Sequence, residues 1–153
     1  MLNNVLQSLS LAGQLAGLAE LPVEAVEAAL EVRVQTVDLS RNRLAAVPAG
    51  LEPLTPQLYE LNLSNNKLAS LPAFLGTGRL LQFINLANNQ LTDLPAELGG
   101  LPHLREVALN MNQFSTIPEV SILHFNDQLL HWRSAIFYIY RFCTPARSWK
   151  LFW

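Results

Sequence analysis

The chain has 153 residues, of which 50% are hydrophobic and 14% are charged, and its formal net charge is −2. This length fits one domain, and this composition is typical of a globular protein and excludes a disordered one. The small net charge gives no reason to expect a nucleic-acid partner. The single cysteine, Cys143, excludes an intramolecular disulfide and favours a reducing compartment, so we expect a cytoplasmic protein.

Residues 1–33 predict a covering for the N-terminal edge of a core. The start lacks a Lys or Arg before its apolar part, which is unlike a signal peptide. Residues 6–14, LQSLSLAGQ, read as a degenerate copy of the repeat that follows, with Gln14 in place of a recurrent Asn. Residues 22–31, PVEAVEAALE, predict a helix with Pro22 as its first residue. Its expected apolar stripe contains Val23, Val26, Ala29 and Leu30.

Residues 34–120 contain four repeats. Segments of 18 residues beginning at Val34, Leu58, Leu81 and Leu104 align without gaps, and their starts are 24, 23 and 23 residues apart. The shared pattern is L-x-x-L-x-L-x-x-N-x-L-x-x-L-P-x-x-L. Four copies at a nearly fixed period indicate a repeat architecture.

The repeat pattern has a physical reading at each position. The x-L-x-L part alternates with period two, which predicts a half-buried strand, and successive strands would stack in parallel. A proline then fixes φ as the chain turns back, and the short return predicts an α- or 3₁₀-helix. These prolines are Pro48, Pro72, Pro95 and Pro118. A buried amide needs hydrogen-bond partners, so we expect a structural ladder of Asn42, Asn66, Asn89 and Asn112.

This is the leucine-rich-repeat pattern. With its L-P-x-x-L return and Gly-rich turns, as in LPAELGGLPHL, the chain resembles intracellular leucine-rich-repeat proteins of the Ras-scaffold and leucine-rich-repeat-containing types over about residues 6–120. The predicted fold is an α/β solenoid with a curved parallel sheet on the concave side and short helices or 3₁₀ turns on the convex side. The resemblance implies an intracellular, non-catalytic protein with an interaction role.

Function is expected on the concave face, where strand side chains are not used by the core. The candidate protein-binding residues are Thr36, Asp38, Arg41, Glu60, Asn62, Phe83, Asn85, Glu106 and Asn110. Strands lie ~4.8 Å apart, so four of them offer a face only ~15–20 Å wide, which suits a short peptide or one edge of a domain.

Phe83 has two readings. An exposed aromatic residue flanked by Glu60 and Glu106 predicts an anchor for an apolar group that lies between basic groups. The alternative is an ordinary surface residue shielded by Tyr59 or Arg105, because single exposed apolar residues are common.

Residues 121–153 lack the repeat pattern. They hold 9 of the 13 aromatic residues, and 4 Lys/Arg against 1 Asp/Glu, whereas residues 1–120 hold 6 against 11. Three interpretations stay open. One is a capping helix over 124–142, which an open solenoid end requires. Another is an unrelated ending on a fragment of a longer array without independent function. The third is a basic, aromatic surface that binds a partner groove or a membrane surface, which would make the chain a membrane-surface adaptor.

No residue set predicts catalysis. His124, His131, Cys143 and Asp127 are a weak metal pattern, and no phosphate-binding loop, zinc-protease or nucleophile-elbow motif is present. We therefore expect no enzyme, no metal and no cofactor. The predicted function is a monomeric interaction module or scaffold with a protein or peptide partner. We expect neither nucleic acid nor membrane as a partner.

Overall fold

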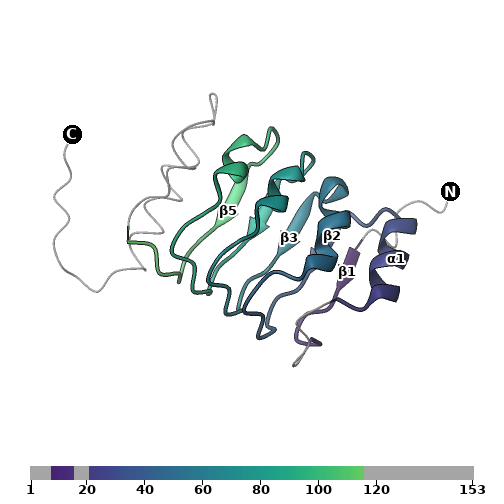
Figure 1. Cartoon of the computed structure of the whole chain (residues 1–153), viewed down its shortest axis with the longest axis horizontal. Helices are drawn as coiled ribbons and strands as arrows, with labels where there is room; N and C mark the ends of the chain where they lie inside the picture. The colour runs from purple at the N-terminus through teal and green to yellow at the C-terminus, as the bar shows by residue number, and fades with distance from the viewer. Residues whose placement is uncertain (1–7, 16–20, 116–153) are drawn as a thin grey trace.

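The computed structural model describes residues 8–15 and 21–115. Within these residues five parallel strands pair in chain order in one sheet (Figure 1). The strands are β1 Ser8–Ser10, β2 Thr36–Asp38, β3 Glu60–Asn62, β4 Phe83–Asn85 and β5 Glu106–Ala108. The predicted α/β solenoid with a parallel sheet is confirmed.

Each strand is three residues long, and its middle residue points into the core. Val37, Leu61, Ile84 and Val107 are buried, and Leu9 of β1 is half-buried. The register places these five side chains at one height, because each is paired with the next. Side chains alternate along a strand, so the outer residues of every strand share the opposite face. The register therefore builds both the core and the outward surface.

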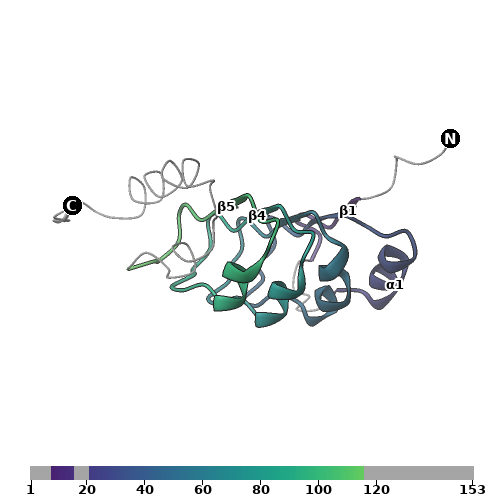
Figure 2. The ribbon, with the colours of Figure 1, turned by 90° about the horizontal axis from the view of Figure 1, so that it is seen from above.

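The chain returns through 3₁₀-helices. They are η1 Ala49–Gln57, η2 Ala73–Thr77 and η3 Ala96–Gly100, each directly after a repeat proline. They lie on the side of the molecule opposite the strands (Figure 2). The longer η1 belongs to the repeat of 24 residues, so the extra residue is accommodated on the return side and the strand register is undisturbed.

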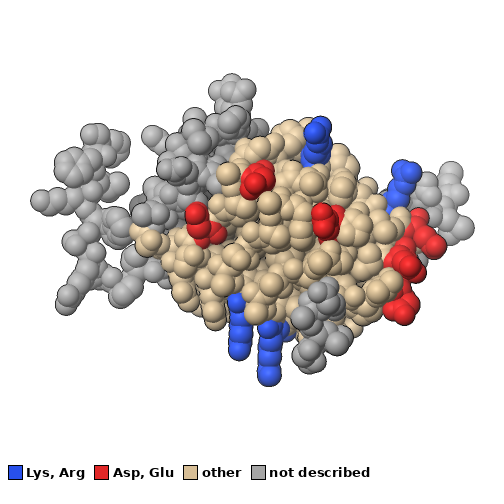
Figure 3. All heavy atoms as spheres, viewed as in Figure 1, with Lys and Arg blue, Asp and Glu red and all other residues tan. Residues whose placement is uncertain are grey.

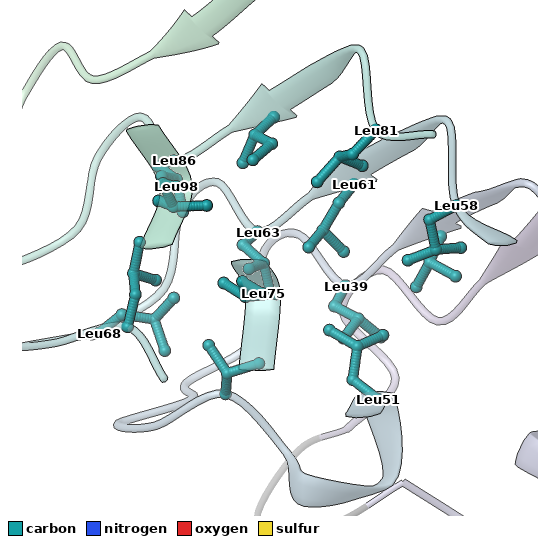
Figure 4. Packing of buried hydrophobic residues seen from close by; sticks show 14 of the residues in the cluster. Leu39, Leu51, Leu58, Leu61, Leu63, Leu68, Leu75, Leu81, Leu86 and Leu98 are labelled. Carbon is teal, nitrogen blue, oxygen red and sulfur yellow. The ribbon is translucent and has the colours of Figure 1, made fainter. Parts of the chain in front are cut away.

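The core is a continuous column of leucines between the strands and the 3₁₀-helices. Leu51 of η1, Leu75 of η2 and Leu98 of η3 point inward towards the strand leucines (Figure 4). Leu39, Leu63 and Leu86, just after their strands, are fully buried as well. Truncating one such leucine to alanine typically costs about 2–5 kcal/mol. Each repeat packs its leucines against one another and against those of the adjacent repeats, so the repeats stabilise one another.

Helix α1, Val23–Glu31, packs on the N-terminal part of this core. Pro22 precedes the first helical residue instead of occupying it, and its carbonyl accepts hydrogen bonds from the Ala25 and Val26 N–H groups. The predicted apolar stripe is wrong in half of its members. Ala29 is buried and Val26 is half-buried, whereas Val23 is 66% exposed and Leu30 is 38% exposed. The Gly50 turn of η1 faces Val26, so α1 meets the core with Val26 and Ala29, and Val23 and Leu30 stay exposed.

The degenerate first repeat joins the sheet through β1 and then departs from the pattern. Gly13 occupies the left-handed position at φ +68°, in line with Arg41 of the next repeat at φ 56°. Gln14 is exposed, so it does not take the place of a ladder asparagine. Instead Leu15 comes one residue early, is buried, and donates its N–H to Asn42 Oδ1 at 2.9 Å.

Candidate functional site

The outward residues of the five strands form one surface, here named the sheet face. Its residues are Ser8, Ser10, Thr36, Asp38, Glu60, Asn62, Phe83, Asn85, Glu106 and Ala108. They lie in two rows that cross the strands, one through the first strand residues and one through the third. Three carry carboxylates, and none is Lys or Arg. The sheet face is thus polar and acidic, with one aromatic side chain.

Phe83 is that aromatic residue, and it is 41% exposed. In the sheet register it lies between Glu60 on β3 and Glu106 on β5, and both of these residues are exposed. Strand spacing puts each glutamate ~4.8 Å from Phe83 at the backbone. Shielding by neighbours has not buried the ring. The structure therefore brings together an apolar contact and two flanking negative charges.

Asp38, Asn62 and Asn85 have a structural task besides their place on the sheet face. Each side-chain oxygen accepts a hydrogen bond from the backbone N–H two residues later, at 2.9, 3.1 and 3.1 Å. These local bonds hold the turn after each strand. The three side chains are half-buried. In the asparagines the oxygen is turned towards the backbone, so Nδ2 is the group left to face a ligand.

A further row follows the strands, at the residue before each ladder asparagine. Arg41, Asn65, Asn88 and Met111 all have φ between 56° and 59°. All four are exposed, and Asn88 Nδ2 donates to Asn65 Oδ1 at 2.8 Å. Asn110 is half-buried, and its carbonyl accepts the Asn88 N–H. Arg41 and Asn110 therefore lie beside the sheet face, beyond its last strand residues.

The four ladder asparagines are buried and hold consecutive repeats together. Asn66 donates from Nδ2 to the Leu39 and Leu63 carbonyls, both at 3.0 Å, and accepts the Leu44 N–H at 3.2 Å. The other three ladder asparagines make equivalent hydrogen bonds in their own repeats. Their bonds run from Asn42, Asn89 and Asn112 to their own strand exit and to the preceding repeat. These side chains are scaffold.

Tyr59, which the sequence suggested only as a shield for Phe83, is itself part of the exposed surface. It immediately precedes β3, is 37% exposed, and its carbonyl accepts the N–H groups of Gln82 and Phe83. In the repeat alignment it shares a position with Gln35, Gln82 and Arg105, directly before the first strand residue. The alignment could have indicated this fourth row, because the same position precedes every strand.

A second acidic feature of the described surface is α1. Glu24, Glu27 and Glu31 are exposed on it, and Figure 3 shows acidic side chains gathered over that end of the molecule. Carboxylates on an exposed helix are ordinarily solvated. Among residues 8–15 and 21–115, no group of three or more His, Cys, Asp or Glu side chains is placed to hold a metal ion.

Several predicted features lie outside the described residues. The tail of 121–153 and its three interpretations, including His124, His131 and Cys143, are among them. In the part of the chain that the structure describes, no helix is long and apolar enough to cross a membrane.

The fold and the stacked asparagines define a repeat solenoid, and the family comparison names its class. The leucine rich repeat family matches at residues 32–91 and 56–114. Together these ranges cover 32–114, which is 83 of 153 residues and more than half of the chain. The chain therefore belongs to the leucine-rich-repeat family. A search of curated proteins finds no match.

Solved structures also resemble the chain. A leucine-rich-repeat protein of Leptospira interrogans is 39% identical with a TM-score of 0.55, over 63% of this chain and 24% of its own. The BIR3–SERK2 complex of Arabidopsis thaliana matches with 31% identity and a TM-score of 0.55, over 71% of this chain and 57% of the other. The Toll–Spatzle complex of Drosophila gives 26% identity and a TM-score of 0.51, over 68% and 17%. The chain spans less than two thirds of each of these proteins.

Proposed function

We propose that the chain is a non-catalytic interaction module, or scaffold, that binds a protein or peptide on its sheet face. The observation that carries this proposal is Phe83, an exposed aromatic residue in the middle of a small polar sheet. Aromatic residues are enriched at the anchoring positions of protein interfaces. Two of the similar solved structures are complexes, BIR3 with SERK2 and Toll with Spatzle, which supports binding as the general use of this fold.

The sequence supports proposals for the location of the protein and for the kind of partner it binds. The resemblance to intracellular repeat proteins, such as leucine-rich-repeat-containing protein 40, supports a cytoplasmic location. The absence of cysteine pairs from the sequence agrees with this. The short strands limit the contact area, so a monomer would take a peptide or the edge of a domain.

The test compares partner capture by two matched variants of the full chain. The sheet variant combines Glu60→Lys, Phe83→Ala and Glu106→Lys. The control variant combines Glu52→Lys, Val23→Ala and Glu97→Lys, which makes the same change of charge at exposed positions on η1, α1 and η3. Quantitative mass spectrometry of captured proteins is the readout, with circular dichroism to verify folding.

The expected result is loss of specific partners from the sheet variant and their retention by the control. Partners that survive in the sheet variant as well as in the wild type would remove the sheet face from consideration.

A further inference from the structure

The charge and spacing on the sheet face define the chemistry of its partner more narrowly. We propose that the sheet face binds an extended peptide segment in which one apolar side chain lies between two basic ones. This inference rests on the proposed function, because it names the partner of the same surface.

Charge is the first argument. The ten sheet-face residues contain Asp38, Glu60 and Glu106 and no basic residue. Glu60 and Glu106 are exposed, and they lie on the two strands that flank Phe83. Complementary charge steers association and suppresses partners of like charge. An acidic segment would place its carboxylates against these glutamates, so the favoured segment is basic.

Spacing is the second argument. Glu60 and Glu106 are separated by two strand spacings, or ~10 Å. In an extended peptide, residues that share a face are ~6.6–6.8 Å apart, so the first and third of three such residues are ~13 Å apart. Lys and Arg side chains are long enough to lean inward by the remaining ~2 Å on each side. A basic-x-apolar-x-basic segment crossing the strands then places its apolar residue over Phe83.

The second row of the sheet face is the third argument. Asn62 and Asn85 lie beside Glu60 and Phe83 on the same strands, two residues along. Because their Oδ1 atoms accept local backbone N–H groups, their Nδ2 groups are oriented as donors away from the turn. An extended backbone carries free carbonyls along its length, whereas a helix has bonded all but its last four. This amide row therefore favours an extended segment over a helical one.

The experiment is selection from a random nine-residue peptide phage library on the full chain. The Glu60→Lys, Glu106→Lys double variant serves for counter-selection. Enriched sequences are then synthesised, and their binding is measured by fluorescence anisotropy. We expect basic-x-apolar-x-basic sequences. Binding to the double variant should fall more than about tenfold, because two weak attractions become repulsions. Phe83→Ala should weaken binding about fivefold or more. The Glu52→Lys, Glu97→Lys control should bind like the wild type.

A charge exchange completes the test. Peptides whose two basic residues are replaced by glutamate should bind the double variant better than the wild type. Acidic or neutral peptides that depend on Phe83 would overturn the basic partner while keeping the sheet face as the binding surface. Peptides indifferent to every sheet-face change would overturn both proposals. A selection that yields no peptide would overturn the peptide proposal alone, because a folded partner remains.

Discussion

Replacement of Asn66 by alanine is the sharpest test of how the repeats are held together. The side chain accepts the Leu44 N–H and donates to the Leu39, Leu63 and Ser64 carbonyls. The carbonyls keep other donors, since Leu39 O also accepts from Asn42 and Leu63 O from Asn89. The Leu44 N–H, by contrast, loses the acceptor that Asn66 gives it.

The magnitude follows from this asymmetry. An orphaned buried N–H costs about 1–3 kcal/mol, and the lost donor bonds add about 1 kcal/mol because their acceptors keep a partner. We therefore expect Asn66→Ala to lower the free energy of unfolding by about 2–4 kcal/mol, a large part of a typical total of about 5–15 kcal/mol. Urea unfolding followed by circular dichroism measures it. Lys67→Ala, at the exposed neighbouring residue, is the control and should change stability by less than about 0.5 kcal/mol.

Asn66→Asp separates the donor from the acceptor. The carboxylate still accepts the Leu44 N–H, but it faces three carbonyl oxygens in a buried site. Burial and these oxygens favour the protonated acid, so the pKa of this carboxyl would rise above its value in the unfolded chain. The folded state then binds the proton more readily, and stability falls as pH rises above about 4, the ordinary pKa of aspartate in an unfolded chain. A loss below 1 kcal/mol in Asn66→Ala, or a pH-independent Asn66→Asp, would refute the ladder argument.

The remaining predictions concern single positions elsewhere in the repeats, and each is read from the urea midpoint. Ala108→Asn should stabilise by about 0.5–1 kcal/mol, because Ala108 pairs with Asn85, and an asparagine there would offer the Asn110 N–H the side-chain acceptor that Asn85 offers the Ala87 N–H; no gain would mean that this turn differs from the earlier ones. Met111→Asn should stabilise by about 0.5–1 kcal/mol, since Met111 has φ 59° and asparagine tolerates that conformation better. Gly76→Ala should destabilise by about 1–3 kcal/mol, because its Cβ would press on Glu97, including the carbonyl oxygen at 3.1 Å; a neutral result would show that η2 and η3 separate freely.

Sequence alone predicted the parts of this molecule that recur. Because each repeat has the same Leu and Asn positions, the alignment predicts the strands and their register. The structure contains these strands in that register. The failures lie where a position occurs once. Val23 and Leu30 fit a helical stripe, but only Ala29 and Val26 of α1 are covered, and periodicity does not report how much of a helix face its neighbours cover.

The candidate site was predictable in position but not in detail. The alternation of a strand places Glu60, Phe83 and Glu106 outward, and the repeat places them side by side. The sequence does not predict that the Oδ1 atoms of Asn62 and Asn85 accept backbone hydrogen bonds, because an asparagine at such a position can also contact a ligand. That choice depends on the turn that follows each strand, and the turn conformation is a property of the folded chain.

The asparagine bonds give the array a direction. Each ladder side chain accepts a backbone N–H from the repeat before it. Asn66 Oδ1 accepts from Leu44, Asn89 Oδ1 from Leu68, and Asn112 Oδ1 from Leu91. The backbone N–H two residues after each ladder asparagine thus finds its acceptor in the asparagine of the following repeat. If repeats were added from the N-terminal side, each new repeat would supply the acceptor for the one before it, and its own equivalent N–H would wait for the next repeat. Among the ladder bonds, shortening such an array from its C-terminal side would uncover a backbone N–H, whereas shortening it from the N-terminal side would uncover a side-chain amide. Backbone bonds are lost at either end, since Lys67 N–H, for example, donates to the Leu44 carbonyl of the preceding repeat.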